Sequence, residues 1–454
     1  MPKTGSTKVL QAYRYALDPN DRQGSQLASH CGAARFAFNW GLALIANRLE
    51  EPTSEVPWTF PALLRQWNRV KEEVAPWWSE NSKEAYSSGL SALASALKNF
   101  SASKEGRRAG ARVGFPRFRK RGTRRDSCRF TTGSIRVLAD GKHIQLPRLK
   151  TIRTQEPTFK LLKLMDNSRA RILSATISRE ADRWFVSFGC EVDRGSFQPT
   201  RINRIVGVDV GVSNLAVLST GEIIPNPRPL KNSLRHLSRA NRRLSRRSPG
   251  SRRREIARRT LSRIHLRVRN QRRDALHRLT TGLAREHSTI VVERLHVRGM
   301  LRNRRLARTL ADTGMATIRR QLAYKTVWYG SRLVTAEPFY PSSKMCSSCG
   351  WVKVKLSLGE RHFRCAHCGM TMDRDKNAAL NLARLAEPVA GSAPGTITAR
   401  GGKHMAGAVA SAAVCEAGTE QRAAPASVSE LISMTDGRKR RGGAANLPEM
   451  RTVA

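Results

Sequence analysis

Four cysteines in the C-terminal half of the chain have the spacing of a metal site. They form two Cys-x-x-Cys pairs separated by 15 residues: Cys346, Cys349, Cys365 and Cys368. Such pairs are typical of a zinc site with four thiolate ligands and no open coordination position. A glycine follows each pair, where a tight turn directs backbone amides towards sulfur. The sequence therefore predicts a structural Zn²⁺ ribbon that contributes to folding.

Three acidic residues stand where carboxylates could converge on a divalent ion. Asp209 lies in an expected strand, Glu293 ends another, and Asp375 precedes the expected helix of NAALNLARL. Phosphodiester hydrolysis uses one or two such ions held by oxygen ligands, and Mg²⁺ suits carboxylates. Asp209, Glu293 and Asp375 are therefore the candidate catalytic and Mg²⁺-binding residues. Asp373 competes with Asp375, because only one of the two would face the metals if the backbone is extended.

Each acid taken alone is weak evidence for a metal site. An aspartate after a strand is often a cap or part of a turn. The segment GVDVGVSN around Asp209 also suggests the phosphate-binding hairpin of a sugar kinase or an actin-like ATPase. That alternative is disfavoured because no second glycine-rich phosphate loop accompanies it. The combination of acids and cysteine pairs favours metal-dependent chemistry.

The charge of the chain points to a polyanionic partner. Among 454 residues, 82 Lys and Arg face 35 Asp and Glu, which gives a formal net charge of +47. Phosphate contacts would neutralise this charge, so nucleic acid is favoured over a membrane surface or a ribosomal role. No apolar run approaches the roughly 20 residues of a membrane span, and we expect neither a membrane segment nor a signal peptide. Single cysteines suit a reducing compartment and are expected to be inert buried thiols: Cys31, Cys128, Cys190 and Cys415.

Two segments concentrate the basic residues. In the first, residues 104–130, Phe115, Phe118 and Phe130 alternate with cations, so aromatic rings could stack on bases while cations follow the backbone. The nucleic-acid-binding candidates there are Arg117, Arg119, Lys120, Arg124 and Arg125. The alternative is a solvated loop with its phenylalanines in a core. The second segment, residues 231–287, predicts two helices with one apolar and one arginine-rich face, interrupted at residues 248–251.

Periodicity predicts a mixed α/β chain. Alternation predicts a strand over residues 8–17, and helical spacing predicts a buried helix face from Leu27 to Ile45. A hairpin is expected to turn at Asp140-Gly141, and ISREADRWFVSFGCEV is typical of a strand pair. RINRIVGVDVGVSNLAVLSTGEII predicts a β-meander whose first strand carries Asp209.

Several motifs together resemble the OrfB/TnpB family of insertion-sequence proteins, which are related to the type V CRISPR effector nucleases. They are GVDVGVSNLAVLSTG, IVVERL followed by GM, FYPSSKMCSSCG, CAHCG and DRDKNAALNL, within a resemblance that covers about residues 8–386. The resemblance implies a split RNase H-like (RuvC) nuclease core with an inserted Cys₄ zinc ribbon, and an N-terminal β-barrel with inserted helices. It assigns catalysis to Asp209, Glu293 and Asp375. After Glu293 the family usually has an acidic residue and Leu-Asn, where this chain has Arg294, Leu295 and His296.

The expected domains follow from this resemblance. An N-terminal nucleic-acid-recognition region, helix-turn-helix-like or a β-barrel with a helical insertion, would precede the first two nuclease motifs, the zinc ribbon, the third motif and a disordered tail. Their expected ranges are 1–200, 201–340, 341–370, 371–388 and 389–454.

The function implied is a metal-dependent, RNA-guided DNA endonuclease of a transposable element. Its partners would be a guide RNA derived from the element and a double-stranded DNA target, in the bacterial cytoplasm at the nucleoid. Base pairing would then read sequence while the protein reads backbone and shape. Two alternatives remain open: a strand-transfer transposase that uses the same acids without a guide, and a non-catalytic zinc-ribbon regulator that binds nucleic acid.

Overall fold

The computed structural model describes residues 8–51, 55–122, 125–195, 197–357 and 359–386. The described residues form two compact units, one within residues 8–94 and 117–386, the other of residues 95–116. In the described part of the smaller unit, the rings of Phe100 and Phe115 lie 5.4 Å apart, and the Val113 amide donates to Ser103 Oγ at 2.8 Å. The expected tail over residues 389–454, with Cys415, lies outside the described residues.

The N-terminal strands form a seven-stranded sheet in the order β2-β6-β7-β1-β5-β4-β3. Their bounds are β1 Lys8–Asp18, β2 Ser127–Phe130, β3 Arg136–Val137, β4 His143–Leu146, β5 Lys150–Thr154, β6 Ala170–Glu180 and β7 Arg183–Asp193. The predicted strand, hairpin and strand pair are confirmed as β1, β3–β4 and β6–β7. The expected closed barrel is not: among the described residues no ladder joins the edge strands β2 and β3, which have only four and two residues.

Helices accompany this sheet in the N-terminal region. Their bounds are α1 Asp21–Glu50, α2 Phe60–Val74, the 3₁₀ turn η1 Pro76–Glu80, α3 Lys83–Lys104 and α4 Phe159–Asp166. The predicted apolar face of α1 is buried from Leu27 to Ile45. Cys31, Cys128 and Cys190 are buried free thiols, as expected.

A second sheet has five strands in the order β10-β9-β8-β11-β12. The strands are β8 Arg201–Asp209, β9 Asn214–Leu218, β10 Ile223–Pro225, β11 His287–Val292 and β12 Arg332–Thr335. The predicted β-meander is confirmed, since β8, β9 and β10 pair antiparallel. In contrast, β8, β11 and β12 are parallel, so their carboxyl ends meet at one edge, where α/β sheets bind ligands.

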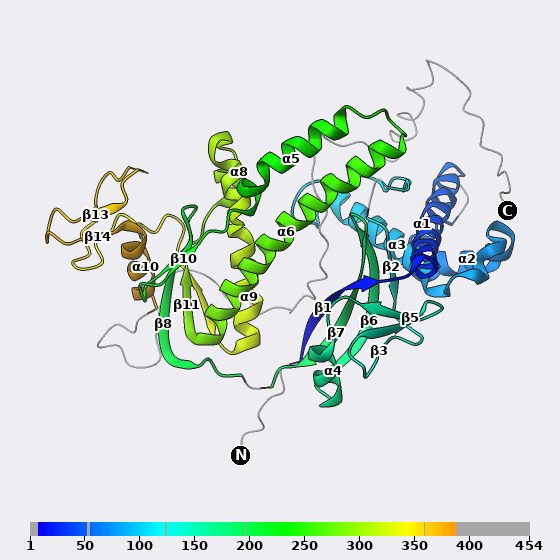
Figure 1. The fold of residues 1–454 in the computed structure, drawn as a ribbon, viewed down its shortest axis with the longest axis horizontal. Helices are drawn as coiled ribbons and strands as arrows, with labels where there is room; N and C mark the ends of the chain where they lie inside the picture. The colour runs from blue at the N-terminus through cyan, green and yellow to red at the C-terminus, as the bar shows by residue number, and fades with distance from the viewer. Residues whose placement is uncertain (1–7, 52–54, 123–124, 196, 358, 387–454) are drawn as a thin grey trace. The chain divides into compact units, whose positions relative to one another are not determined.

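Helices cover both faces of this sheet (Figure 1). The helices of this region are α5 Pro229–Ser245, α6 Arg252–Glu286, α7 Val297–Met300, α8 Arg304–Thr313, α9 Met315–Tyr329 and α10 Arg374–Arg384, of which α6, α9 and α10 pack on the sheet. Val206, Val208 and Val292 pack against α6 and α9, whereas Val291 packs against Leu382 of α10. The predicted pair of basic helices is confirmed as α5 and α6. Within the described chain, no helix combines the length and apolar composition that membrane spanning requires.

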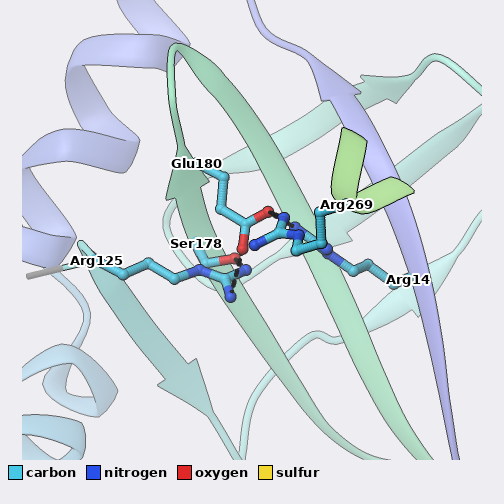
Figure 2. A network of polar contacts seen from close by, with 5 residues as sticks. All are labelled: Arg14, Arg125, Ser178, Glu180 and Arg269. Atoms are coloured by element: carbon cyan, nitrogen blue, oxygen red, sulfur yellow. Dashed lines mark hydrogen bonds and ion pairs between the residues drawn. The ribbon is translucent and has the colours of Figure 1, made fainter. Parts of the chain in front are cut away.

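Glu180, the last residue of β6, is shared by three arginines (Figure 2). It accepts from Arg14 at 2.8 Å, pairs with Arg125 at 2.7 Å and accepts a hydrogen bond from Arg269 of α6. Arg125 also donates to Ser178 Oγ at 2.7 Å. Burial raises the pKa of Glu180, but the hydrogen bonds from Arg14 and Arg269 outweigh burial and leave the pKa below its ordinary value. One carboxylate thus joins the N-terminal sheet to α6.

Glu180→Ala should lower the stability of the fold, because it leaves three guanidinium groups side by side without their acceptor. We expect a loss of about 1–3 kcal/mol at pH 7, discounted for the partly exposed arginines. Since the folded-state pKa is depressed, the stabilisation is present above the ordinary glutamate pKa and is lost as pH falls through the depressed value. Thermal unfolding measures the change. Glu255→Ala is the control, because its pair with Arg259 is exposed; equal shifts would contradict the prediction.

Candidate metal centre

The register of two parallel strands brings Asp209 and Glu293 together. Val208 of β8 pairs with Val292 of β11, and the two acids are the next residues on these strands. Neighbouring strands lie about 4.8 Å apart, so both carboxylates leave the same edge of the sheet at adjacent positions. Both residues are partly buried.

The third acid, Asp375, lies on α10, which contacts the backbone of β8. A Cβ on Gly207 would lie 2.0 Å from the Ala379 carbonyl oxygen and 2.6 Å from the Ala383 amide nitrogen. Asp375 is four residues before Ala379 and therefore on the same face of α10. Asp209 is two residues after Gly207 and therefore on the same side of β8. The contact at Gly207 thus directs Asp375 towards Asp209.

Burial and neighbouring charges both change the pKa values of the acids at this site. Burial, followed by the charges of Glu293 and Asp375, raises the pKa of Asp209 to about 8, although Arg374 opposes the shift. Burial also raises the pKa of Glu293, opposed by a hydrogen bond from Ser342. Asp209 and Glu293 therefore ionise less readily than ordinary carboxylates. Carboxylate oxygens are the ligands that Mg²⁺ prefers, but among the described residues only the four cysteines bring at least three ligand atoms within 4.8 Å of one another.

Asp373 and Asp375 have different partners. Asp373 is the N-cap of α10 and accepts from the amides of Asp375 at 2.9 Å and Lys376 at 3.0 Å. Asp375 is less exposed, and its Oδ1 accepts from Arg374 Nε at 3.2 Å and Nη2 at 3.1 Å. The capping role of Asp373 favours Asp375 as the metal ligand.

Three polar residues that the sequence interpretation did not single out support the acids. Buried Ser342 donates a hydrogen bond to Glu293. Asn381 Nδ2 donates to the carbonyls of Ser342 at 2.8 Å and Met345 at 2.6 Å. Asn377 donates to the same Met345 carbonyl at 2.7 Å and accepts from the Ser347 amide at 2.9 Å. The sequence did contain a signal for Asn377 and Asn381: they are four residues apart on an otherwise apolar helix face. Both are fully buried, and buried side-chain amides need hydrogen-bond partners.

The four predicted zinc ligands come together. Their sulfur atoms all lie within 4.8 Å of one another, with Cys346 and Cys368 Sγ 3.7 Å apart and Cys349 and Cys365 Sγ 3.6 Å apart. The Ser348 amide donates to Cys346 Sγ and the Cys368 amide to Cys365 Sγ, each at 3.4 Å. These amides stabilise thiolates, so the site fits a tetrahedral Zn²⁺.

The ribbon around these cysteines consists of short strands and tight turns. Its strands are β13 His362–Arg364 and β14 Thr371–Asp373, paired antiparallel. Gly350 and Gly369 have φ angles of +79° and +72°, as the knuckle turns require. Phe363 is fully buried beside Cys346 and Cys365, with Trp351 and Met370 packed against them. The ribbon ends directly before α10, so the chain returns from the zinc site to Asp375.

The predicted nucleic-acid-binding residues have unequal surroundings. Arg117 and Lys120 are exposed. Arg119 stacks on Phe38, with its guanidinium carbon 3.5 Å from the ring centre, and its backbone pairs with Asn39. Arg125 is in the Glu180 cluster, and Arg124 lies outside the described residues.

The aromatic residues of this segment also differ in their exposure. Phe130 is fully buried and packs beside His30, so it cannot stack on a base. Phe118 is 58% exposed and Phe115 packs on Phe100. Only part of the segment therefore matches the stacking expectation.

Comparison with protein families finds three matching models. "Probable transposase" matches residues 187–304, "Cas12f1-like, TNB domain" matches residues 316–382, and "Helix-turn-helix domain" matches residues 7–53, which contain β1 and α1. Together these models span the N-terminal strand and helix, the five-stranded sheet and the ribbon.

Bacterial relatives match most of the chain. A Mycobacterium tuberculosis H37Rv protein named "Putative RNA-guided DNA endonuclease Rv2885c" is 42% identical over 404 residues, covering 84% of this chain and 87% of that protein. Proteins with the same description in Streptomyces pristinaespiralis and Escherichia coli K12 are 35% and 30% identical, each covered over 92% of its length. Among solved structures, a Cas12f1–sgRNA–target DNA complex gives a TM-score of 0.44 at 12% identity, covering 83% of this chain and 99% of that one.

Gly207→Ala should displace α10 and with it Asp375, because the added methyl group would overlap the backbone of Ala379. We expect a stability loss of about 3 kcal/mol or more, measured by chemical denaturation. Gly24→Ala is the matched control: Gly24 lies in α1 with open space around its Cα, and the change should stabilise the helix by about 1 kcal/mol. Similar behaviour of the two variants would contradict the α10 contact.

Replacing one zinc ligand should release the metal and loosen the ribbon. We expect about one zinc per chain in the purified protein and almost none in Cys365→Ser, measured by elemental analysis. Limited proteolysis should then cut the variant between β12 and α10. Cys190→Ser, which alters a buried thiol of β7, should retain zinc. Unchanged zinc content in Cys365→Ser would exclude this ligand set.

Proposed function

The chain belongs to the OrfB/TnpB family of insertion-sequence proteins, and from this premise we propose that it is a metal-dependent, RNA-guided DNA endonuclease with a RuvC-like centre. The observation that carries the proposal is the register of β8 and β11, which places Asp209 and Glu293 at one edge of a mixed sheet, where the charge of Asp375 also acts on Asp209. The relatives support the RNA-guided class, since 84% of the chain aligns with a protein so named.

The acids have distinct supports within the proposed centre. Asp209, Glu293 and Asp375 would hold Mg²⁺, which activates water and stabilises the leaving oxygen when bound. Ser342 fixes the carboxylate of Glu293, and the helix start at Asp373 fixes the position of Asp375. The zinc ribbon would have a structural role, because its four thiolates leave no open position.

A basic groove between α5 and α6 supports a polyanionic partner. A cavity of about 750 Å³ there has apolar walls that include Ala240 and Ile264. Its charged lining consists of Arg239, Arg243, Arg267 and Arg278, with His236, and one acid, Asp274, which pairs with Arg278 at 2.9 Å. Guanidinium groups along a groove suit successive phosphates of a nucleic-acid backbone. The guide RNA and the target DNA are the proposed partners, and a cytoplasmic location at the nucleoid follows from that substrate.

Two alternative functions share parts of this geometry. A strand-transfer transposase would use the same acids without a guide RNA. A non-catalytic regulator would bind nucleic acid without needing Asp209. A bound guide RNA would distinguish our proposal from the transposase. A requirement for Asp209 would distinguish it from the regulator.

The decisive experiment begins with protein purified from cells that carry its flanking DNA. We expect a discrete RNA ending at the element boundary, identified by sequencing, and Mg²⁺-dependent cleavage of a matching DNA target. Asp209→Ala should reduce cleavage by on the order of a thousandfold or more while RNA is retained. Heterogeneous cellular RNA without guided cleavage would favour the alternatives.

Asp373 offers a matched control for Asp375. Asparagine caps a helix as well as aspartate does, so Asp373→Asn removes a charge and keeps the cap of α10. We expect Asp373→Asn to cleave DNA nearly normally and Asp375→Asn to be inactive. The reverse result would assign the third acid to Asp373.

A further inference from the structure

Phe339 is exposed to an unusual degree for an aromatic residue. It lies between β12 and the zinc ribbon, and 97% of its surface is accessible, against 58% for Phe118. A phenylalanine in this state contributes almost no burial to the stability of the fold.

The backbone at Phe339 is also strained. Its φ angle is +66°, in the left-handed region that bulky residues avoid. The Tyr340 amide donates to the Glu337 carbonyl at 3.2 Å, with Pro338 between them. Proline at the second position and a positive φ at the third are typical of a type II turn, where glycine is preferred. A phenylalanine there costs about 1–2 kcal/mol without compensating contacts.

The turn is held firmly on both sides. Before it, the buried Ala336 amide donates to the Val292 carbonyl at 2.9 Å, directly before Glu293. After it, Tyr340 packs beside Val291 and donates to the Asn381 carbonyl at 3.3 Å. The ring of Phe339 is thus presented from a fixed support.

Phe339 is close to the proposed metal centre along the chain. Ser342, which holds Glu293, is three residues away, so the two Cα atoms are at most about 11 Å apart. This distance corresponds to about three nucleotides of a stacked strand, at roughly 3.4 Å per nucleotide. Stacking of a base on an aromatic ring does not depend on charge, so it can hold a strand next to a group of acids.

We propose that Phe339 is a stacking platform for an unpaired base of the DNA strand that enters the metal centre. This rests on the proposed function and specifies its substrate: the strand is single-stranded where it passes Phe339. In this role Phe339 positions the strand by stacking on one base, beside the phosphate that reacts.

The test couples a change in the protein to a change in the DNA. Full-length protein with its bound RNA, in an Asp209→Ala background, is titrated with single-stranded oligonucleotides in which one abasic site is moved along the sequence. We expect one abasic position to weaken binding by about 5- to 150-fold with Phe339 present, in line with stacking energies. Phe339→Ala should weaken binding to the intact strand similarly and show no further loss at that position. Phe339→Trp should restore the base dependence.

Two variants separate this role from a structural one. Phe339→Gly should raise thermal stability because it relieves the strained turn, yet weaken strand binding. Phe159→Ala is the control: Phe159 is 56% exposed but covers Gly141, so it should affect stability and not the strand.

The outcomes distinguish this inference from the proposed function. If cleavage depends on Asp209 but no abasic position weakens binding more with Phe339 than in the Phe339→Ala variant, the stacking role is overturned and the proposed function stands. A change in oligomeric state in Phe339→Ala with unaltered base dependence would also overturn it, in favour of a protein contact. Absence of Asp209-dependent cleavage would overturn the proposed function, while strand affinity would still report on Phe339.

Discussion

The close approach of α10 to β8 at Gly207 is the constraint on which the site depends. Any side chain larger than hydrogen would separate the helix from the strand. Since Asp209 is on the strand and Asp375 on the helix, the separation of these backbones sets the separation of the two carboxylates. The register of β8 and β11 places Glu293 beside Asp209, so backbone packing sets the positions of the three candidate acids.

The local patterns were readable from the sequence because they depend on local chemistry. The cysteine spacing, the strands before Asp209 and Glu293, and the two basic helices required only periodicity and ligand preferences. The sequence does not predict the contact of Gly207 with α10, because a glycine before an aspartate has no recognisable distant partner. Ser342 lies in the FYPSSKMCSSCG motif, but its role becomes visible only through the hydrogen bond of its hydroxyl to Glu293. The expected barrel was wrong because, among the described residues, no ladder joins the edge strands β2 and β3, and the pattern within a strand does not predict which distant strand it pairs with.

The positive charge of the chain is not all available to nucleic acid. Arg14, Arg125 and Arg269 share one carboxylate, and Arg119 stacks on Phe38. Lys325 of α9 is buried and donates to Thr280 and Thr281 of α6, and burial lowers its pKa to about 8. Residue type alone therefore cannot separate cations that build the fold from those that face a phosphate backbone. Burial makes part of that distinction: Arg117 and Lys120 are exposed, whereas Arg119 is partly buried and stacks on Phe38.

Asn377 and Asn381 have a consequence for how the two metal sites relate. Their amides bind the carbonyl of Met345, the residue immediately before Cys346, and Asn381 also binds the carbonyl of Ser342. The zinc knuckle, the support of Glu293 and the helix of Asp375 are therefore joined through one set of buried hydrogen bonds. Under the proposed function, zinc occupancy and the alignment of the acids would be thermodynamically linked, and this linkage would be reciprocal. A metal without a vacant coordination position would then act as an effector of the one that performs chemistry.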